Sequence, residues 1–163
     1  MIILGIDPGI ATVGFGVVSS ENGKPVCVDF GIISTPKTDS ISKRLFTVSE
    51  GLTALIRKFK PDAVAVEELF FNNNQKTAIM VAEARGVILC TAVREQCDLY
   101  EYTPLQIKQG LTGYGRADKQ QMQQMVKILL KLSTIPKPDD AADALAVALC
   151  HAQTNRFAGQ FRA

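Results

Sequence analysis

The chain has 163 residues, of which 47% are hydrophobic and 21% charged, and its formal net charge at neutral pH is +2. That length allows one well-buried core and excludes two of ordinary size, so we expect a single domain over residues 1–154 and a flexible tail at 155–163. No run approaches the roughly 18 to 20 consecutive apolar residues of a membrane span. The opening MIILGIDPG also lacks the features of a signal peptide, so we expect no membrane association and a cytoplasmic location.

The hydrophobic pattern predicts an α/β protein. Residues 2–7, 11–19 and 25–34 are β-rich runs separated by turn signals, which predicts a three-stranded antiparallel meander. A helix over 40–59 follows, and the uniformly apolar run within 62–67 predicts a central parallel strand that is covered on both faces. The pattern then predicts a helix at 75–96, a strand at 98–102, a short helix at 104–110, a helix at 118–132 and a last helix that opens at Asp139.

The predicted helix at 75–96 has more apolar surface than one sheet can cover. Its stripe of Ile79, Ala82, Gly86, Leu89, Cys90 and Val93 is accompanied by valine and isoleucine residues on other faces. Either a neighbouring helix of the same chain or a second subunit must cover the remainder, and the sequence pattern leaves both explanations open.

Basic residues concentrate in one segment of the chain. Residues 105–138 carry six Lys or Arg residues against the single acid Asp118, a local balance of +5 that leaves −3 for the remainder. A basic helix face is usually just solvated. Here the segment also contains LTGYGRADK, in which glycines permit close approach of a ligand and Tyr114 offers a ring for stacking. This combination indicates a surface that contacts nucleic acid.

Acidic residues end or begin three apolar elements. They are Asp7 after ILGI, Glu67 and Glu68 after DAVAV, and Asp139, Asp140 and Asp143 in DDAADALAVAL. Side chains at the carboxyl ends of adjacent strands converge, so Asp7 and Glu67 meet if the first and fourth strands are neighbours, as we expect. Asp143 shares a helix face with both Asp139 and Asp140, because residues three and four apart lie together.

Most of these acids also have an ordinary structural explanation. Asp-Pro-Gly at 7–9 is a common turn sequence, and strand alternation turns either Glu67 or Glu68 away from the site. Acids at 139 and 140 stabilise the start of a helix. Of the three acids in this helix, only Asp143 is left unexplained, because it lies a turn inside the helix among apolar neighbours.

Clustered carboxylates of this kind favour divalent cations. Two like charges about 4 Å apart repel by about 4 kcal/mol at an effective dielectric near 20. Oxygen ligands select Mg²⁺ or Mn²⁺ over Zn²⁺. Two such ions about 3.5 to 4 Å apart can activate a water and stabilise the leaving oxygen in phosphodiester hydrolysis. Beside a basic segment, the acids therefore predict a metal-dependent site for a nucleic-acid backbone.

The strings LGIDPGIATVGFG, AVEELFF, EARGV, YTPLQIKQGLTGYGRADK and DDAADALAVA, in this order, resemble the RuvC-type Holliday-junction resolvases from Met1 to about His151. The resemblance implies a ribonuclease H-like fold with a five-stranded mixed sheet flanked by helices. It also implies a homodimeric endonuclease of recombination and repair that hydrolyses four-way DNA junctions symmetrically, leaving 5′-phosphate and 3′-hydroxyl ends. The branch-migration proteins RuvA and RuvB would be partners, and the dimer would cover the second apolar face at 75–96.

The resemblance also assigns site residues. The family's acidic quartet falls on Asp7, Glu67, Asp140 and Asp143, which would bind two Mg²⁺ ions per subunit, with Mn²⁺ able to substitute.

The family's nucleic-acid contacts also map onto this chain. Phe70 matches an aromatic residue placed against junction bases, and Lys108 and Lys119 match positions expected to contact phosphate. Arg116 belongs to the same glycine-containing loop and is a further candidate for DNA binding.

Two other classes of protein share part of this pattern. The opening LGIDPGIATVG also resembles the phosphate-binding hairpin of the actin-like ATPases, chaperones and sugar kinases, but those proteins need two such domains and this chain is too short for the pair. A non-resolvase nucleic-acid-binding or RNA-processing relative of the same fold, as in the YqgF family, has a similar opening. The DAAD helix and the GYGRADK loop favour the resolvases over that relative.

Overall fold

The computed structural model describes residues 1–69 and 75–154, and this part of the chain forms a mixed α/β structure. Its strands are β1 (Ile2–Asp7), β2 (Thr12–Glu21), β3 (Lys24–Ser34), β4 (Ala63–Glu67) and β5 (Leu99–Tyr102). Its helices are α1 (Ile41–Phe59), α2 (Gln75–Arg94), α3 (Pro104–Thr112), α4 (Lys119–Leu129) and α5 (Asp139–Thr154). The predicted elements are all present, although α2 and α4 end two to three residues earlier than predicted.

The five strands form one sheet in the order β3-β2-β1-β4-β5. β1 pairs antiparallel with β2 and parallel with β4, and β4 pairs parallel with β5, which confirms the mixed sheet. Ile6 lies opposite Val66 in the register of β1 and β4, so the next residues, Asp7 and Glu67, leave the sheet at the same edge. The expected neighbourhood of the first and fourth strands is therefore confirmed.

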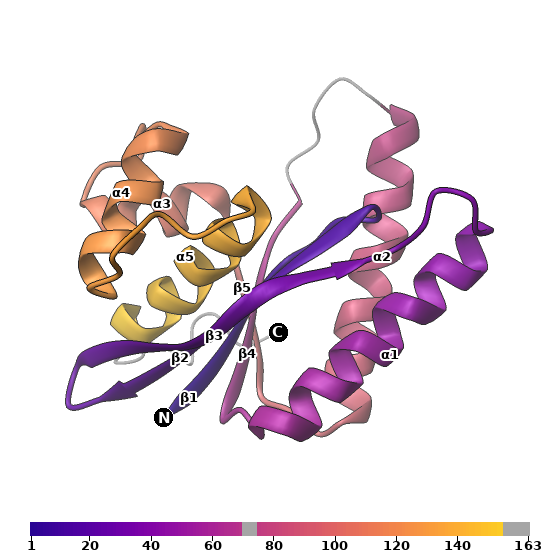
Figure 1. Ribbon diagram of the computed structural model, residues 1–163, viewed down its shortest axis with the longest axis horizontal. Helices are drawn as coiled ribbons and strands as arrows, with labels where there is room; N and C mark the ends of the chain where they lie inside the picture. The colour runs from indigo at the N-terminus through magenta and orange to yellow at the C-terminus, as the bar shows by residue number, and fades with distance from the viewer. Residues whose placement is uncertain (70–74, 155–163) are drawn as a thin grey trace.

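Helices cover both faces of the sheet, with α1 and α2 on one face and α3, α4 and α5 on the other (Figure 1). The apolar side chains of β1 alternate between two core clusters, with Ile3 on the α5 side and Leu4 and Ile6 on the α1 side. Ala63 to Val66 of β4 are all buried, as predicted for a strand with two covered faces. None of the helices in the described ranges has the length and apolar character needed to cross a bilayer.

α5 lies directly on the sheet because small residues on both sides remove the space between them. A Cβ atom on Gly14 of β2 would lie 2.0 Å from the carbonyl oxygen of Asp140, and one on Gly5 of β1 would lie 2.2 Å from that of Ala144. From Ala141 to His151 the helix is buried at every position except Asp143. The close contact therefore fixes where the acids of α5 stand relative to β1 and β2.

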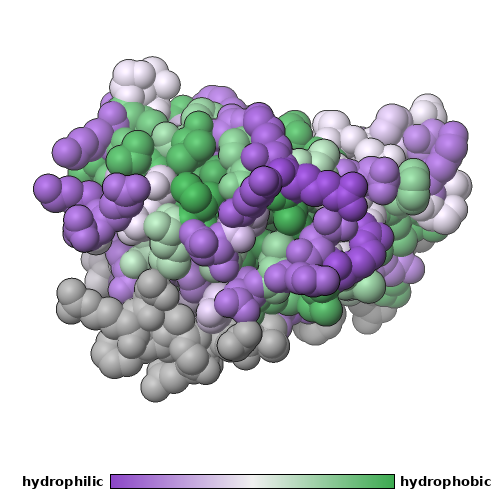
Figure 2. Space-filling view, turned by 90° about the horizontal axis from the view of Figure 1, so that it is seen from below, coloured by the Kyte–Doolittle hydropathy of each residue, from purple (hydrophilic) through white to green (hydrophobic). Residues whose placement is uncertain are grey.

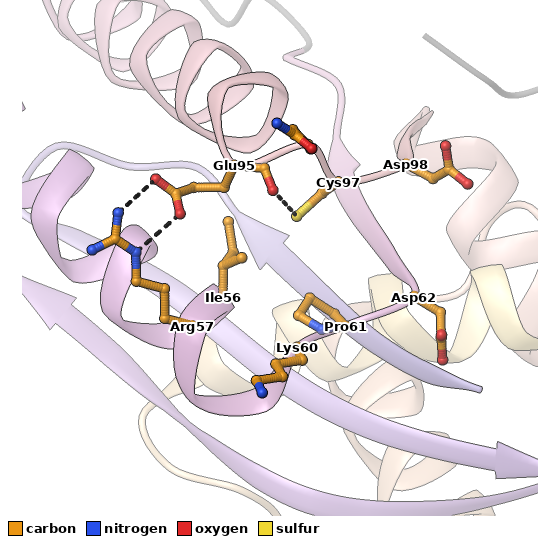
Figure 3. A pocket seen from close by; sticks show the side chains of 9 residues that line it. Ile56, Arg57, Lys60, Pro61, Asp62, Glu95, Cys97 and Asp98 are labelled. Atoms are coloured by element: carbon orange, nitrogen blue, oxygen red, sulfur yellow. Dashed lines mark hydrogen bonds and ion pairs between the residues drawn. The ribbon is translucent and has the colours of Figure 1, made fainter.

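The end of the sheet where β4 and β5 begin lies opposite the end that carries Asp7 and Glu67. It faces the viewer in Figure 2, and hydrophilic residues form a band across it. A surface pocket of about 520 Å³ lies at that end, between the last turns of α1 and α2 (Figure 3). Its lining mixes basic and acidic side chains, among them Arg57, Lys60, Asp62 and Asp98. The pocket is separate from the edge where Asp7 and Glu67 leave the sheet.

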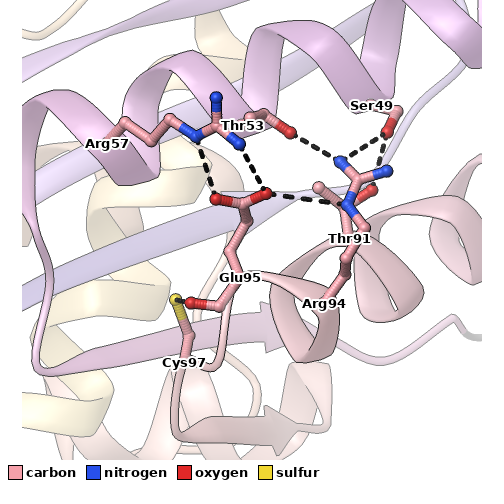
Figure 4. Close-up of polar contacts among 7 residues, drawn as sticks. All are labelled: Ser49, Thr53, Arg57, Thr91, Arg94, Glu95 and Cys97. Atoms are coloured by element: carbon pink, nitrogen blue, oxygen red, sulfur yellow. Dashed lines mark hydrogen bonds and ion pairs between the residues drawn. The ribbon is translucent and has the colours of Figure 1, made fainter.

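Polar contacts tie α1 to α2 (Figure 4). Glu95, just after α2, accepts hydrogen bonds from Arg57 Nε and Nη2 at 3.0 and 3.2 Å. Arg94 Nη2 donates to Thr53 Oγ1 at 2.8 Å, and the hydroxyl groups of Ser49 and Thr91 are 2.9 Å apart. These contacts hold the two helices at a fixed rotation, which determines which face of α2 points outward.

The outward face of α2 is apolar. Ile79 and Val93 are 62% and 63% exposed, and Cys90 between them is also exposed. The opposite stripe of Ala84, Ile88 and Ala92 is buried against α1 and the sheet. Within the described residues, α1 covers one side of α2 only, so the prediction of excess apolar surface on this helix is confirmed.

Candidate active site with acidic and basic walls

Three carboxylates from two elements meet at the carboxyl end of the central strands. Asp7 ends β1, whereas Asp140 and Asp143 belong to the first turns of α5. One oxygen from each of the three lies within 4.8 Å of the others, and all three side chains are half-buried. The spacing is close enough for the three residues to bind a common cation.

Glu67 joins this cluster through Asp7, because the two side chains are hydrogen-bonded to one another. Glu67 is the last residue of β4 and lies next to β1. The backbone N–H of Glu68 continues the pairing with β5 by donating to the Tyr102 carbonyl at 2.8 Å. The structure therefore brings the first glutamate of the pair to the other acids, as the family resemblance implies.

The acids perturb one another strongly. Burial, followed by the charges of Glu67, Asp143 and Asp140, raises the pKa of Asp7 to about 8. Burial and the charge of Asp143 raise the pKa of Glu67 to about 7, against the lowering effect of its hydrogen bond to Asp7 and of Lys108. Such shifts mark a site where negative charge has been gathered beyond what the protein alone neutralises.

Lys119 closes the cluster on the α4 side. It is the first residue of α4, whose N-cap Asp118 accepts a 2.8 Å hydrogen bond from the backbone of Gln121. Its Nζ atom lies 3.3 Å from Asp139 Oδ2 and 3.5 Å from Asp143 Oδ2. Burial lowers the pKa of Lys119, but the two acids outweigh that effect and raise it overall.

Asp139 differs from its neighbours in the sequence. Its side chain is 47% exposed, Lys119 and Lys137 both pair with it, and Gln123 Nε2 donates to it at 3.1 Å. The hydrogen bond and charge of Lys119 hold the pKa of this carboxyl below its usual range. Asp139 is thus satisfied by protein groups, whereas Asp140 turns toward Asp7 and Asp143.

A pocket of about 210 Å³ opens between the acids and the basic segment. Its polar lining residues are Glu67, Asp143, Lys108 and Lys119, and its apolar lining residues are Pro104, Ile107, Met122 and Ala146. Lys108 belongs to α3, and a capping box fixes the start of this helix. The backbone N–H of Thr103 donates to the side chain of Gln106, and the backbone N–H of Gln106 donates to the side chain of Thr103. A phosphate in this pocket would meet both lysines and carboxylates, and the carboxylates would need a bridging cation.

The other predicted contacts lie outside this cluster. Arg116 is exposed in the loop between α3 and α4 and does not line the pocket. Tyr114 in the same loop is 56% exposed. Phe70 falls outside the described residues, so its predicted role stays a prediction.

One residue of the site was missed by the sequence analysis. Thr12, the first residue of β2, donates a hydrogen bond from Oγ1 to Asp140 Oδ2. The sequence signal for this contact is the two-residue period of a strand. It places Thr12 on the same face as Gly14 and Gly16, the glycines that contact α5. Recognising it required knowing that α5 begins over this end of β2.

The side chains present fit a hard divalent cation. Every candidate ligand atom in the cluster is a carboxylate oxygen, the donor type that Mg²⁺ and Mn²⁺ prefer. Burial and the neighbouring carboxylates raise the pKa values of Asp7 and Glu67. A bound cation would offset that repulsion.

Comparison with known proteins agrees with this geometry. Residues 3–151 match the family model for the crossover junction endodeoxyribonuclease RuvC. A protein of that description from Alkaliphilus oremlandii is 54% identical over 162 residues, which cover 99% of both chains. One from Caldicellulosiruptor saccharolyticus is 56% identical over 152 residues, covering 93% of this chain and 92% of its own.

Solved structures show the same relationship. Thermus thermophilus RuvC superimposes with a TM-score of 0.90 at 36% identity, covering 99% of both chains. The same protein in complex with a Holliday junction substrate gives 0.89 at 34% identity, again over 99% of both chains. Together with the acidic cluster, the two adjacent lysines and the sheet order, these matches show that this chain belongs to the RuvC family of crossover junction endodeoxyribonucleases.

Proposed function

We infer that this chain is an endodeoxyribonuclease that resolves Holliday junctions by hydrolysing phosphodiester bonds, and so acts in DNA recombination and repair. The observation that carries this conclusion is the convergence of Asp7, Glu67, Asp140 and Asp143 beside Lys108 and Lys119, in a chain of the RuvC family. Clustered carboxylates beside lysine side chains suit hydrolysis at a phosphate, because the carboxylates can bind a metal ion while the lysines contact the substrate.

We propose that the four acids bind two Mg²⁺ ions per subunit, for which Mn²⁺ substitutes. Bound ions of this kind supply an activated water and stabilise the leaving oxygen. Asp7 interacts with Glu67 and with both acids of α5, so it would be the residue suited to contribute to both ions. The products would carry 5′-phosphate and 3′-hydroxyl ends.

We propose that the two lysines of this pocket, Lys108 and Lys119, bind the DNA backbone. Lys108 and Lys119 line the same pocket as the acids, so they can contact the phosphates that flank the bond being cut. Arg116, exposed on the adjoining loop, would contact a phosphate further along the strand. The proposed role of Phe70 is stacking against a junction base.

We propose that a second copy of the chain covers the outer face of α2. The exposed residues Ile79, Gly86, Cys90 and Val93 follow one helical stripe, and a Cβ atom on Gly86 would meet no atom within 4 Å. An isologous contact through this face would pair two active sites by a two-fold axis, matching the symmetry of a four-way junction.

The dimer is tested by Ile79→Lys, with Ile128→Lys as the matched control. Both isoleucines are 62% exposed, but Ile128 belongs to α4, on the other side of the sheet. We expect Ile79→Lys to lower the molecular mass measured by light scattering to that of one chain, while Ile128→Lys keeps the dimer. Equal masses for both variants and the wild type would reject α2 as the interface.

The cellular setting completes the proposal. We propose that the enzyme acts in the cytoplasm on junctions delivered by the branch-migration proteins RuvA and RuvB, and that residues 1–154 form its single nuclease domain.

The experiment that tests the activity is Mg²⁺-dependent cleavage of an end-labelled mobile four-way junction, run beside linear duplex and an RNA–DNA hybrid. We expect paired, religatable cuts in the junction alone, lost in Asp7→Asn. Junction binding without cutting by the wild type would favour a non-catalytic relative of the same fold. Cutting of the hybrid would indicate a ribonuclease H activity, and ATP-dependent thermal stabilisation would favour the ATPase alternative.

A further inference from the structure

We propose that Thr12 is a positioning residue for Asp140, and that it sets the affinity of the carboxylate cluster for its divalent cation. This inference rests on the proposed metal-dependent function. Thr12 Oγ1 donates to Asp140 Oδ2, a contact between residues 128 positions apart in the sequence. One oxygen of Asp140 is thereby fixed, and the cluster of ligand oxygens includes this carboxylate.

The hydroxyl group itself is rigidly placed. Thr12 pairs with Ser34 of β3, and just beyond it the backbone N–H of Thr35 donates to the Ala11 carbonyl at 3.0 Å. Thr35 Oγ1 also donates to the Ile10 carbonyl. A β-branched side chain at the start of a strand anchored in this way has little rotational freedom. Thr12 can therefore restrict the carboxylate of Asp140 to one orientation.

The same strand also fixes the backbone of Asp140. Gly14, two residues further on the same face of β2, leaves just enough room for the Asp140 carbonyl, because a Cβ atom there would lie 2.0 Å from it. β2 therefore positions Asp140 at two points. Gly14 packs against its backbone carbonyl, and the hydroxyl of Thr12 binds its side chain.

The chemistry of the donor distinguishes Asp140 from its neighbours. Asp139 and Asp143 both pair with the charged ammonium group of Lys119, which offsets part of their negative charge. A threonine hydroxyl is neutral, so it orients Asp140 while leaving the full charge of the carboxylate for a cation. Hydrogen-bond partners of metal-binding side chains typically contribute about 10- to 100-fold in metal affinity or activity.

The test compares Thr12→Val, Thr12→Ala and Thr12→Ser by calorimetric titration with Mn²⁺ in the absence of DNA. Valine keeps the branched shape, alanine removes any steric conflict, and serine keeps the hydroxyl. We expect valine and alanine to weaken Mn²⁺ binding by about tenfold or more, and serine to restore it. Thr47→Val is the matched control, because its hydroxyl lies in α1, on the other face of the sheet, and bonds to the Lys43 carbonyl and not to an acid, so it should leave Mn²⁺ affinity unchanged.

Junction cleavage gives a second readout. For Thr12→Val we expect the half-saturating Mg²⁺ concentration to rise by a similar factor, while the rate at saturating Mg²⁺ recovers toward that of the wild type. Unchanged Mn²⁺ affinity in folded Thr12→Val or Thr12→Ala would overturn the proposal, as would an equal loss in Thr47→Val. Because the titration contains no DNA, a wild-type chain that binds Mn²⁺ but fails to cut junctions would reject the proposed function and leave this inference intact.

Discussion

At the scale of single residues, His151 shows how a potential metal ligand is removed from the active site. Its ring is buried, Nδ1 lies 2.7 Å from the Tyr102 hydroxyl, and the ring also contacts Tyr100 with centroids 4.5 Å apart. The helix carries it two turns beyond Asp143, so it packs in the core beside β5.

Burial lowers the pKa of His151 to about 4. An unfolded histidine titrates near 6.5, so stability from keeping this ring neutral is complete above that pH and is lost as the pH falls toward 4, by at most about 1.4 kcal/mol per pH unit. Asp7 and Glu67 act in the opposite direction, because their folded pKa values are raised. The clean measurement is therefore an NMR titration of the ring of this sole histidine. We expect no titration between about pH 7.5 and 5.5, and a midpoint near 6.5 would contradict the burial argument.

Lys119 is expected to compete with the metal ion. Its ammonium group occupies the space beside Asp143 that a divalent cation would share, and like charges repel there. We expect Lys119→Gln to bind Mn²⁺ several-fold more tightly without DNA, yet to cleave junctions more slowly because a phosphate contact is lost. Lys137→Gln is the matched control, since Lys137 pairs with Asp139 at 3.6 Å and the two substitutions remove the same charge. Weaker Mn²⁺ binding by Lys119→Gln would show that the lysine helps to assemble the site.

At the scale of elements, the contact between β2 and α5 places half of the site. Asp140 and Asp143 reach Asp7 only because α5 rests on glycines of the sheet. Alanine-rich helices can approach a sheet this closely, and α5 carries alanine at 141, 142, 144, 146 and 148.

Gly14→Ala tests this contact. The added methyl group would lie 2.0 Å from a backbone atom of α5, so the helix must shift, and we expect a loss of about 1–3 kcal/mol in the free energy of unfolding. We also expect Mn²⁺ binding to be lost, because Asp140 moves with the helix. Gly31→Ala is the control: in β3 its methyl group would contact the ring of Phe15 at 2.9 Å, away from α5. If both variants lose stability and both keep Mn²⁺ affinity, the close contact does not position the acids.

At the scale of the whole molecule, the active site and the proposed dimer face belong to different layers. The acids stand at the carboxyl end of β1 and β4, and the outer face of α2 lies beyond the opposite surface of the sheet (Figure 1). The bonds between α1 and α2 fix the rotation of that face. A two-fold dimer through α2 would leave both acid clusters open to DNA, one for each of two opposed strands.

Mixed dimers test this arrangement. Chains carrying two different affinity tags, one wild type and one with Asp7→Asn, would be co-expressed and purified through both tags. On a supercoiled plasmid with an extruded cruciform, we expect the mixed dimer to give nicked circles, because one subunit cuts one strand. Wild-type dimers carrying the same two tags should give linear product. Linear product from the mixed dimer would mean that one active site cuts both strands.

The sequence by itself determined the elements and the chemistry. Hydrophobic patterns located the strands and helices found at residues 1–69 and 75–154, because burial imposes regular spacings on apolar residues. Six acids, Asp7, Glu67, Glu68, Asp139, Asp140 and Asp143, stood out because carboxylates that interrupt apolar elements cost stability unless a cation or a partner compensates them. The family resemblance alone narrowed them to those at 7, 67, 140 and 143.

The tertiary structure decided what depends on contacts between distant segments. It brought Glu67 rather than Glu68 to Asp7, because the register of β1 and β4 sets which side chain faces the cluster. It also placed Asp139 against Lys119 and Lys137, and Asp140 against Thr12. Two adjacent acids at the start of a helix look equivalent in a sequence, and only the elements packed against each one make them differ.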